Sequence, residues 1–151
     1  MEIDLKNIFR NKVRSFLELS RSTTEQEAFN RMMEGYPERQ RQWFGELIGD
    51  GTLAEGFRRG IDRYREIGFE MEVVDISNDG MDAVLEIQRS CPVFETAREF
   101  GLPPRKVCFV LCDMDVASTN KAFPDWTVKT IARKVDGDCV CIFKHERKAA
   151  P

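Results

Sequence analysis

The stretch FEMEVVDISNDGMDAVLEI, residues 69–87, decides the fold class because its apolar side chains recur at every second position. Phe69–Ile76 alternates in this way, and Ser77-Asn78-Asp79-Gly80 has the composition of a hairpin turn. After the turn, alternation gives the returning strand one apolar face, formed by Met81, Ala83, Leu85 and Ile87. The stretch therefore predicts an antiparallel hairpin.

A second hairpin is predicted near the end of the chain. Its strands are Trp126–Val135 and Cys139–Lys144, and its turn is Asp136-Gly137-Asp138. Between the hairpins we expect a short helix after Cys91-Pro92 and a longer one over Lys106–Lys121. The longer helix is apolar almost all round in its first three turns, which predicts a buried central helix.

The first 68 residues have a helical period. Ile3–Leu19 carries apolar residues three to five positions apart, and further helices are expected from Thr24 to Gly35, Pro37 to Gly49 and Thr52 to Gly68. The predicted fold is α+β, with a helical N-terminal half packed on an antiparallel sheet of two hairpins and the buried helix between them. We expect one compact domain made of a helical region (1–68), an α+β core (69–146) and a tail (147–151).

Composition narrows the function. The 151 residues include 23 basic and 26 acidic side chains, and the net charge is −3. This balance lacks the basic surplus of a nucleic-acid-binding surface, so no nucleic acid partner is expected. A polar N-terminus and short apolar runs predict no leader and no membrane association, so we expect a cytoplasmic protein with mostly reduced cysteines.

The cysteines of the central helix have a regular spacing. Cys108, Cys112, Asp115 and Thr119 follow one another at intervals of four, three and four, which places them on one stripe of an α-helix. A carboxylate on such a buried helix must be paired, hydrogen-bonded or raised in pKa. Asp115 is therefore the acid that most suggests a site.

The last strand adds further thiols. Alternation puts Cys139, Cys141, Phe143 and His145 on one face. Cys91 falls at the start of a helix, where the peptide dipoles can lower the pKa of a thiol.

Each of these residues also has a purely structural interpretation. Cysteine is often buried as a small hydrophobic residue, and Asp115 can equally be a paired structural acid. His145 lies near a charged C-terminus, so we expect it to be a solvated surface residue. The aromatic residues around Trp43 and Phe57 are expected in the core, although the same helices could present a homodimer surface.

Three motifs together resemble a known family. Cys91-Pro92, Leu111-Cys112-x-x-Asp115 and Val135-Asp136-Gly137-Asp138-Cys139-x-Cys141-Ile142-Phe143 resemble the L-2-amino-thiazoline-4-carboxylic acid hydrolase family. The resemblance covers mainly residues 70–145, and Cys141 takes the usual place of the last family cysteine. A similar ending occurs in the 4-vinyl-reductase domain, which binds small ligands.

The resemblance implies hydrolytic opening of a thiazoline ring, which needs a nucleophile, an acid and a base. Cys112 would be the first candidate nucleophile and Asp115 its acid/base partner. Cys91 and Cys141 are the next catalytic candidates, and no cofactor is expected. The candidate substrate-binding residues are Cys108, Thr119 and Cys139.

Two other functions stay open. The same pocket could hold a small heterocyclic or hydrophobic ligand without chemistry. Alternatively, Cys108-x3-Cys112 and Cys139-x-Cys141 could supply four thiols to a zinc ion, although neither spacing is the usual one. A single histidine excludes a multi-histidine metal site.

Overall fold

The computed structural model describes residues 4–150 and begins with four helices. Thr52 starts the fourth with a capping box, because its side chain accepts from the Glu55 N–H while the Glu55 carboxylate accepts from the Thr52 N–H. Ile3 and Pro151, the outermost residues of the predicted first helix and tail, lie outside the described residues. The four helices, as predicted, are α1 (Leu5–Ser22), α2 (Glu25–Met32), α3 (Tyr36–Ile48) and α4 (Leu53–Glu66).

The two predicted hairpins join into one antiparallel sheet of four strands in the order β1-β2-β4-β3. The second strand of each hairpin lies inside the sheet, so β2 pairs with β4. The sheet and the helices confirm the α+β class. The strands are β1 (Glu70–Asp75), β2 (Met81–Ser90), β3 (Trp126–Ala132) and β4 (Cys141–Lys148).

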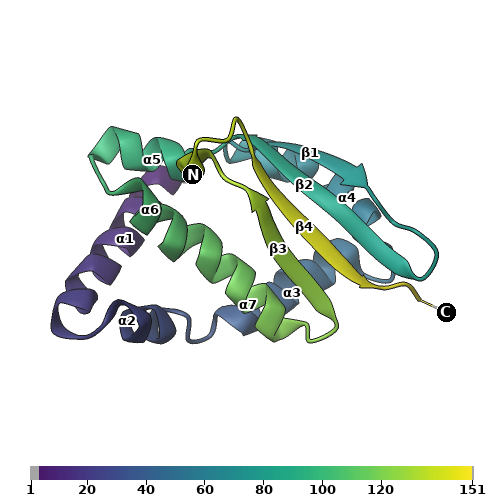
Figure 1. The fold of residues 1–151 in the computed structure, drawn as a ribbon, viewed down its shortest axis with the longest axis horizontal. Coiled ribbons are helices and arrows are strands. Elements are labelled where there is room, and N and C mark those ends of the chain that lie inside the picture. Colours follow the sequence, from purple (N-terminus) through teal and green to yellow (C-terminus); the bar gives the residue numbers. More distant parts are fainter. Residues whose placement is uncertain (1–3, 151) are drawn as a thin grey trace.

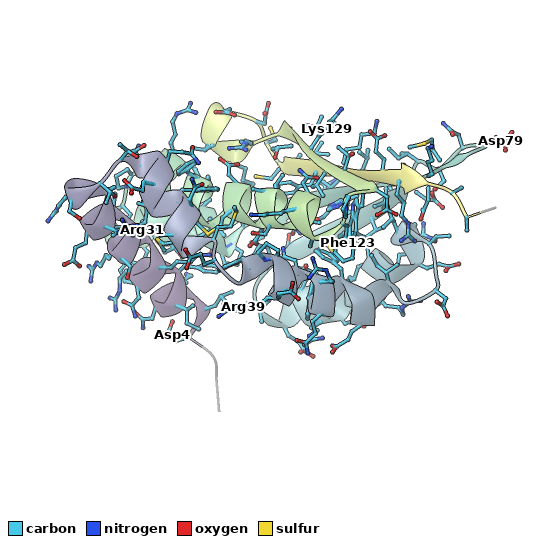
Figure 2. The ribbon with its side chains drawn as sticks, turned by 90° about the horizontal axis from the view of Figure 1, so that it is seen from below. Asp4, Arg31, Arg39, Asp79, Phe123 and Lys129 are labelled. Carbon is cyan, nitrogen blue, oxygen red and sulfur yellow. The ribbon has the colours of Figure 1, made fainter. Side chains whose placement is uncertain are left out.

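The helices cover one face of this sheet. In Figure 1, α3 and α4 lie behind the strands, and the other face is open toward the viewer. Figure 2 shows the same arrangement from below, with Lys129 on the uncovered side of the sheet. Within residues 4–150, no helix is long and apolar enough to span a bilayer.

The predicted central helix is confirmed and contains a turn that was not predicted. It runs through α6 (Pro104–Cys108), the π-helical turn η1 (Phe109–Asp113) and α7 (Met114–Ala122). A π turn holds more residues than an α turn, so it changes the angle between the residues before it and those after it. The short helix before it, α5, spans Pro92–Phe100.

The predicted tail was wrong at its start. β4 continues to Lys148, and Arg147 is held by two contacts that fix the strand end. Its Nε donates to Asp82 Oδ2 at 2.9 Å, and its Nη2 donates to the Gly51 carbonyl at 2.9 Å. The first strand of the second hairpin is also shorter than predicted, because β3 ends at Ala132. A 3₁₀ turn, η2 (Lys134–Asp136), then precedes the loop.

The predicted apolar face of β2 is the face that the helices leave uncovered. The side chains of Met81, Ala83, Leu85 and Ile87 lie on the uncovered face, and the opposite set faces the helices. That set is more polar: Asp82 accepts from the Leu53 N–H, and Glu86 accepts from Gln88. Alternation gives two faces but does not say which one the helices cover.

The core consists of two clusters of buried side chains. The first joins α1, α2, α5 and the central helix around Phe16, and the second joins α3, α4 and the sheet around Phe57 and Trp126. Phe57 is fully buried and Trp43 packs against the second cluster. Phe57 is therefore a core residue and Trp43 a partly buried one, as one interpretation expected.

Candidate functional site

A cavity of about 380 Å³ lies where the two clusters meet. Its walls come from α1, α3, the end of α4, the start of α5, the central helix and the covered face of the sheet. Pockets that bury small organic ligands begin near this size. The cavity is therefore the candidate functional site.

Five of the seven predicted site residues line this cavity: Cys91, Cys112, Asp115, Thr119 and Cys141. Cys108 is buried in the first cluster and Cys139 is exposed, and neither is part of the lining. Cys108 precedes the π turn η1, whereas Cys112, Asp115 and Thr119 lie within it or after it. The predicted stripe therefore does not include Cys108.

All five cysteines are free thiols. Burial raises the pKa of Cys112 well above its usual value, and the neighbouring thiols raise it further. Burial also raises the pKa of Cys108 to about 11 and that of Cys91 above the usual range. The lowered pKa expected for Cys91 at a helix start was wrong, because burial outweighs the hydrogen bonds from the Phe94 and Val93 backbone.

Cys141 is positioned from outside the cavity. The Lys134 N–H, in the η2 turn, donates to Cys141 Sγ at 3.4 Å.

Within residues 4–150, no group of three or more His, Cys, Asp or Glu side chains is arranged to hold a metal ion. The four thiols considered for zinc are not together, because Cys139 is exposed in the loop before β4.

Asp115 shows the expected upward shift. Burial raises its pKa to about 6, Lys12 lowers it, and Glu86 raises it. More than a third of the residue is accessible, and the residue lines the cavity. The carboxylate is therefore open to solvent and to whatever fills the cavity.

Three polar residues of the sheet wall of the cavity were missed by sequence reasoning. Glu86 and Gln88 lie on β2 and His145 lies on β4. Glu86 accepts from Gln88 Nε2 at 2.6 Å, and its Oε1 lies 3.0 Å from His145 Nε2. An ionised carboxylate only accepts, so this contact fits the imidazole tautomer with its proton on Nε2.

The surface position predicted for His145 was wrong, because only 4% of the residue is exposed. β4 continues past it, and the register places it between Val84 and Val128 in the middle of the sheet. Its ring lies 4.5 Å from the Phe57 ring. Two polar atoms of this group remain buried without a partner, namely His145 Nδ1 and Gln88 Oε1.

The opposite side of the cavity holds a second polar group. Lys12 donates to the Tyr36 hydroxyl, and Gln40 Nε2 donates to Thr119 Oγ1 at 3.1 Å. The Thr119 hydroxyl itself donates to the Asp115 carbonyl at 2.8 Å. Its only proton is therefore used within the central helix, which leaves Thr119 as an acceptor toward a ligand.

The remaining walls are aromatic and aliphatic. Trp43 and Tyr64 meet edge to face with ring centroids 6.2 Å apart. Phe44, Phe69 and Phe143 complete the aromatic part of the lining. The arrangement can bury a small ring and offer hydrogen-bonding groups to its substituents.

The fold and cavity define an α+β domain of the kind that encloses a small internal pocket. No family model matches the chain, and no curated protein matches it either. Among solved structures, the chain is similar to the phenol-responsive sensory domain of the transcription activator PoxR in complex with phenol, with a TM-score of 0.61. The two are 11% identical, and the match covers 97% of this chain and 76% of that domain. This likeness shows the shared fold.

Proposed function

We propose that this domain binds a small organic molecule with an aromatic ring and at least one hydrogen-bond donor. The observation that carries the proposal is the cavity of about 380 Å³, in which aromatic walls adjoin polar side chains. Carboxylates such as those of Glu86 and Asp115 accept hydrogen bonds, so a ligand donor would find a partner there. The shared fold of a domain that responds to phenol supports the same proposal.

Trp43 gives a direct assay, since its indole is part of the cavity wall. We expect phenol, used as the first probe, to change the tryptophan fluorescence with saturation. A Trp43→Phe variant keeps a ring at the position and should lose most of this change. A Cys139→Ser variant, at an exposed position outside the cavity, should respond as the unmodified protein does.

Native mass spectrometry of the purified protein tests the proposal without choosing a ligand. A retained small molecule that leaves unchanged on denaturation would support binding. Absence of any retained molecule, together with no response to phenol or related ring compounds, would overturn it.

Hydrolysis of a cyclic amidine, as the family resemblance implies, is the second candidate function. It is favoured by one observation, that Cys112 and Asp115 line the same cavity. Against it stands the burial of Cys112, which keeps the thiol protonated at neutral pH and so weakens it as a nucleophile. A Cys112→Ser variant that folds and retains full turnover of an aminothiazoline carboxylate would remove Cys112 from the reaction.

A further inference from the structure

We infer that the cavity selects ring compounds that carry a protonated amine, with the ammonium group bound by the Asp115 carboxylate. This inference rests on the proposed binding function and adds the charge of the ligand. It stands on the position of Asp115 and on the other charged groups of the cavity.

The Asp115 carboxylate has no partner within residues 4–150. The two side chains that donate hydrogen bonds to this residue, Gln40 and Thr119, both donate to its backbone carbonyl. Its side chain lines the cavity and stays accessible there. A ligand that fills the cavity would displace water from this carboxylate, and an ammonium group would supply hydrogen-bond donors in place of that water.

The charges around Asp115 come from several elements. Lys12 on α1 is the cation of the lining, and Glu86 on β2 is a second carboxylate. The Lys12 ammonium already donates to the Tyr36 hydroxyl and lies 4.1 Å from the centre of that ring. The other titratable groups of the lining are Tyr36, Tyr64, Cys91, Cys112, Cys141 and His145.

Two carboxylates therefore face one ammonium group in the cavity. A monovalent cation would balance these charges, whereas an anionic ligand would add to the excess. Aromatic walls such as Trp43 and Tyr64 are compatible with a cation, because ring faces attract positive charge.

Benzylamine and benzyl alcohol form a matched pair of probes, because they have the same size and ring and differ in the charge of one group. Calorimetric titration at pH 7.5 should show that benzylamine binds about ten- to a hundredfold more tightly than benzyl alcohol, as expected for a charge-assisted hydrogen bond. An Asp115→Asn variant should lose this preference and keep its affinity for the alcohol. Asp62→Asn, at an exposed position on α4, should behave as the unmodified protein.

The pH dependence gives an independent readout. Aliphatic amines have a pKa of about 10, so benzylamine stays charged from pH 5 to pH 8. Its affinity should rise across this range as Asp115 ionises, while that of benzyl alcohol stays flat. A rise that persists in Asp115→Asn would assign the titration to another group and overturn the inference.

The two proposals fail in different ways. If neither probe nor phenol binds, the binding function itself is wrong. If benzyl alcohol or phenol binds as tightly as benzylamine, ligand binding stands and the selection for an amine is wrong.

Discussion

Glu86 on β2 and His145 on β4 form a diagonal contact across two neighbouring strands, with 3.0 Å between Oε1 and Nε2. Glu86 also accepts from Gln88, so one carboxylate orders two polar side chains of the cavity wall. Exposure of the two paired side chains is only 5% for His145 and 13% for Glu86.

The first prediction concerns this pair. Glu86→Ala leaves two buried donors without their acceptor, so we expect the free energy of unfolding to fall by about 2 kcal/mol. Urea denaturation measures this change. Glu72→Ala is the matched control, because Glu72 lies on β1 in an exposed pair with Arg89 and its loss should change the free energy of unfolding much less. Equal losses in the two variants would contradict a structural role for the Glu86 group.

The second prediction concerns the packing of α4 on α3. A Cβ atom at Gly56 would lie 2.6 Å from Ile48 Cγ1 and 2.9 Å from Ile48 Cα. Gly56→Ala should therefore destabilise the protein by about 1–3 kcal/mol. At Gly45, which lies within α3, an added Cβ atom would have no other atom within 4 Å. Gly45→Ala should therefore stabilise the protein by about 0.5–1 kcal/mol. Thermal unfolding of the two variants should move the midpoint in opposite directions.

The third prediction concerns the pH dependence of stability. The pKa of Asp115 is about 6 in the folded protein, above its unfolded value of 3.8, so the folded state holds the proton more tightly. Between these values the folded state binds more protons, and stability must fall as pH rises. Asp115→Asn should be more stable than the unmodified protein at pH 7.5, by about 1 kcal/mol after allowing for screening by water in the cavity.

Below pH 4 this difference should disappear, because Asp115 is then protonated in both states. Denaturation curves at pH 3.5 and 7.5 test the sign. A variant that is less stable at pH 7.5 would show that the carboxylate contributes favourably to the empty fold.

The fourth prediction concerns thiol reactivity. Cys139 is exposed, whereas burial raises the pKa of Cys91, Cys108 and Cys112. At pH 7, iodoacetamide should modify one thiol quickly, and Cys139→Ser should remove that fast phase. Peptide mapping identifies the thiol. Rapid labelling of Cys112 would contradict its burial and strengthen the hydrolase candidate.

Much of the fold follows from local patterns. Thr24 and Thr52 cap the helices that they were expected to start, and the turn before Gly80 joins the strands of the first hairpin. These features depend on a few neighbouring residues, which is why sequence periodicity captures them. The α+β class follows from their order along the chain.

The site was only partly predictable, because its residues depend on tertiary contacts. Helical spacing brought Cys112, Asp115 and Thr119 together, yet the same spacing included Cys108, which the π turn separates from them. Glu86 and Gln88 are polar residues on a strand, and such residues are ordinarily expected to face water. His145 was placed at the surface because the extension of β4 depends on contacts such as that of Arg147 with Asp82.

The position of the cavity between the two core clusters has a consequence for cooperativity. The cavity walls include side chains that pack in each of the two clusters. A bound molecule would contact both clusters and become part of a single continuous core. Occupancy would then be transmitted as slower amide exchange in α2, which packs in the first cluster but does not line the cavity.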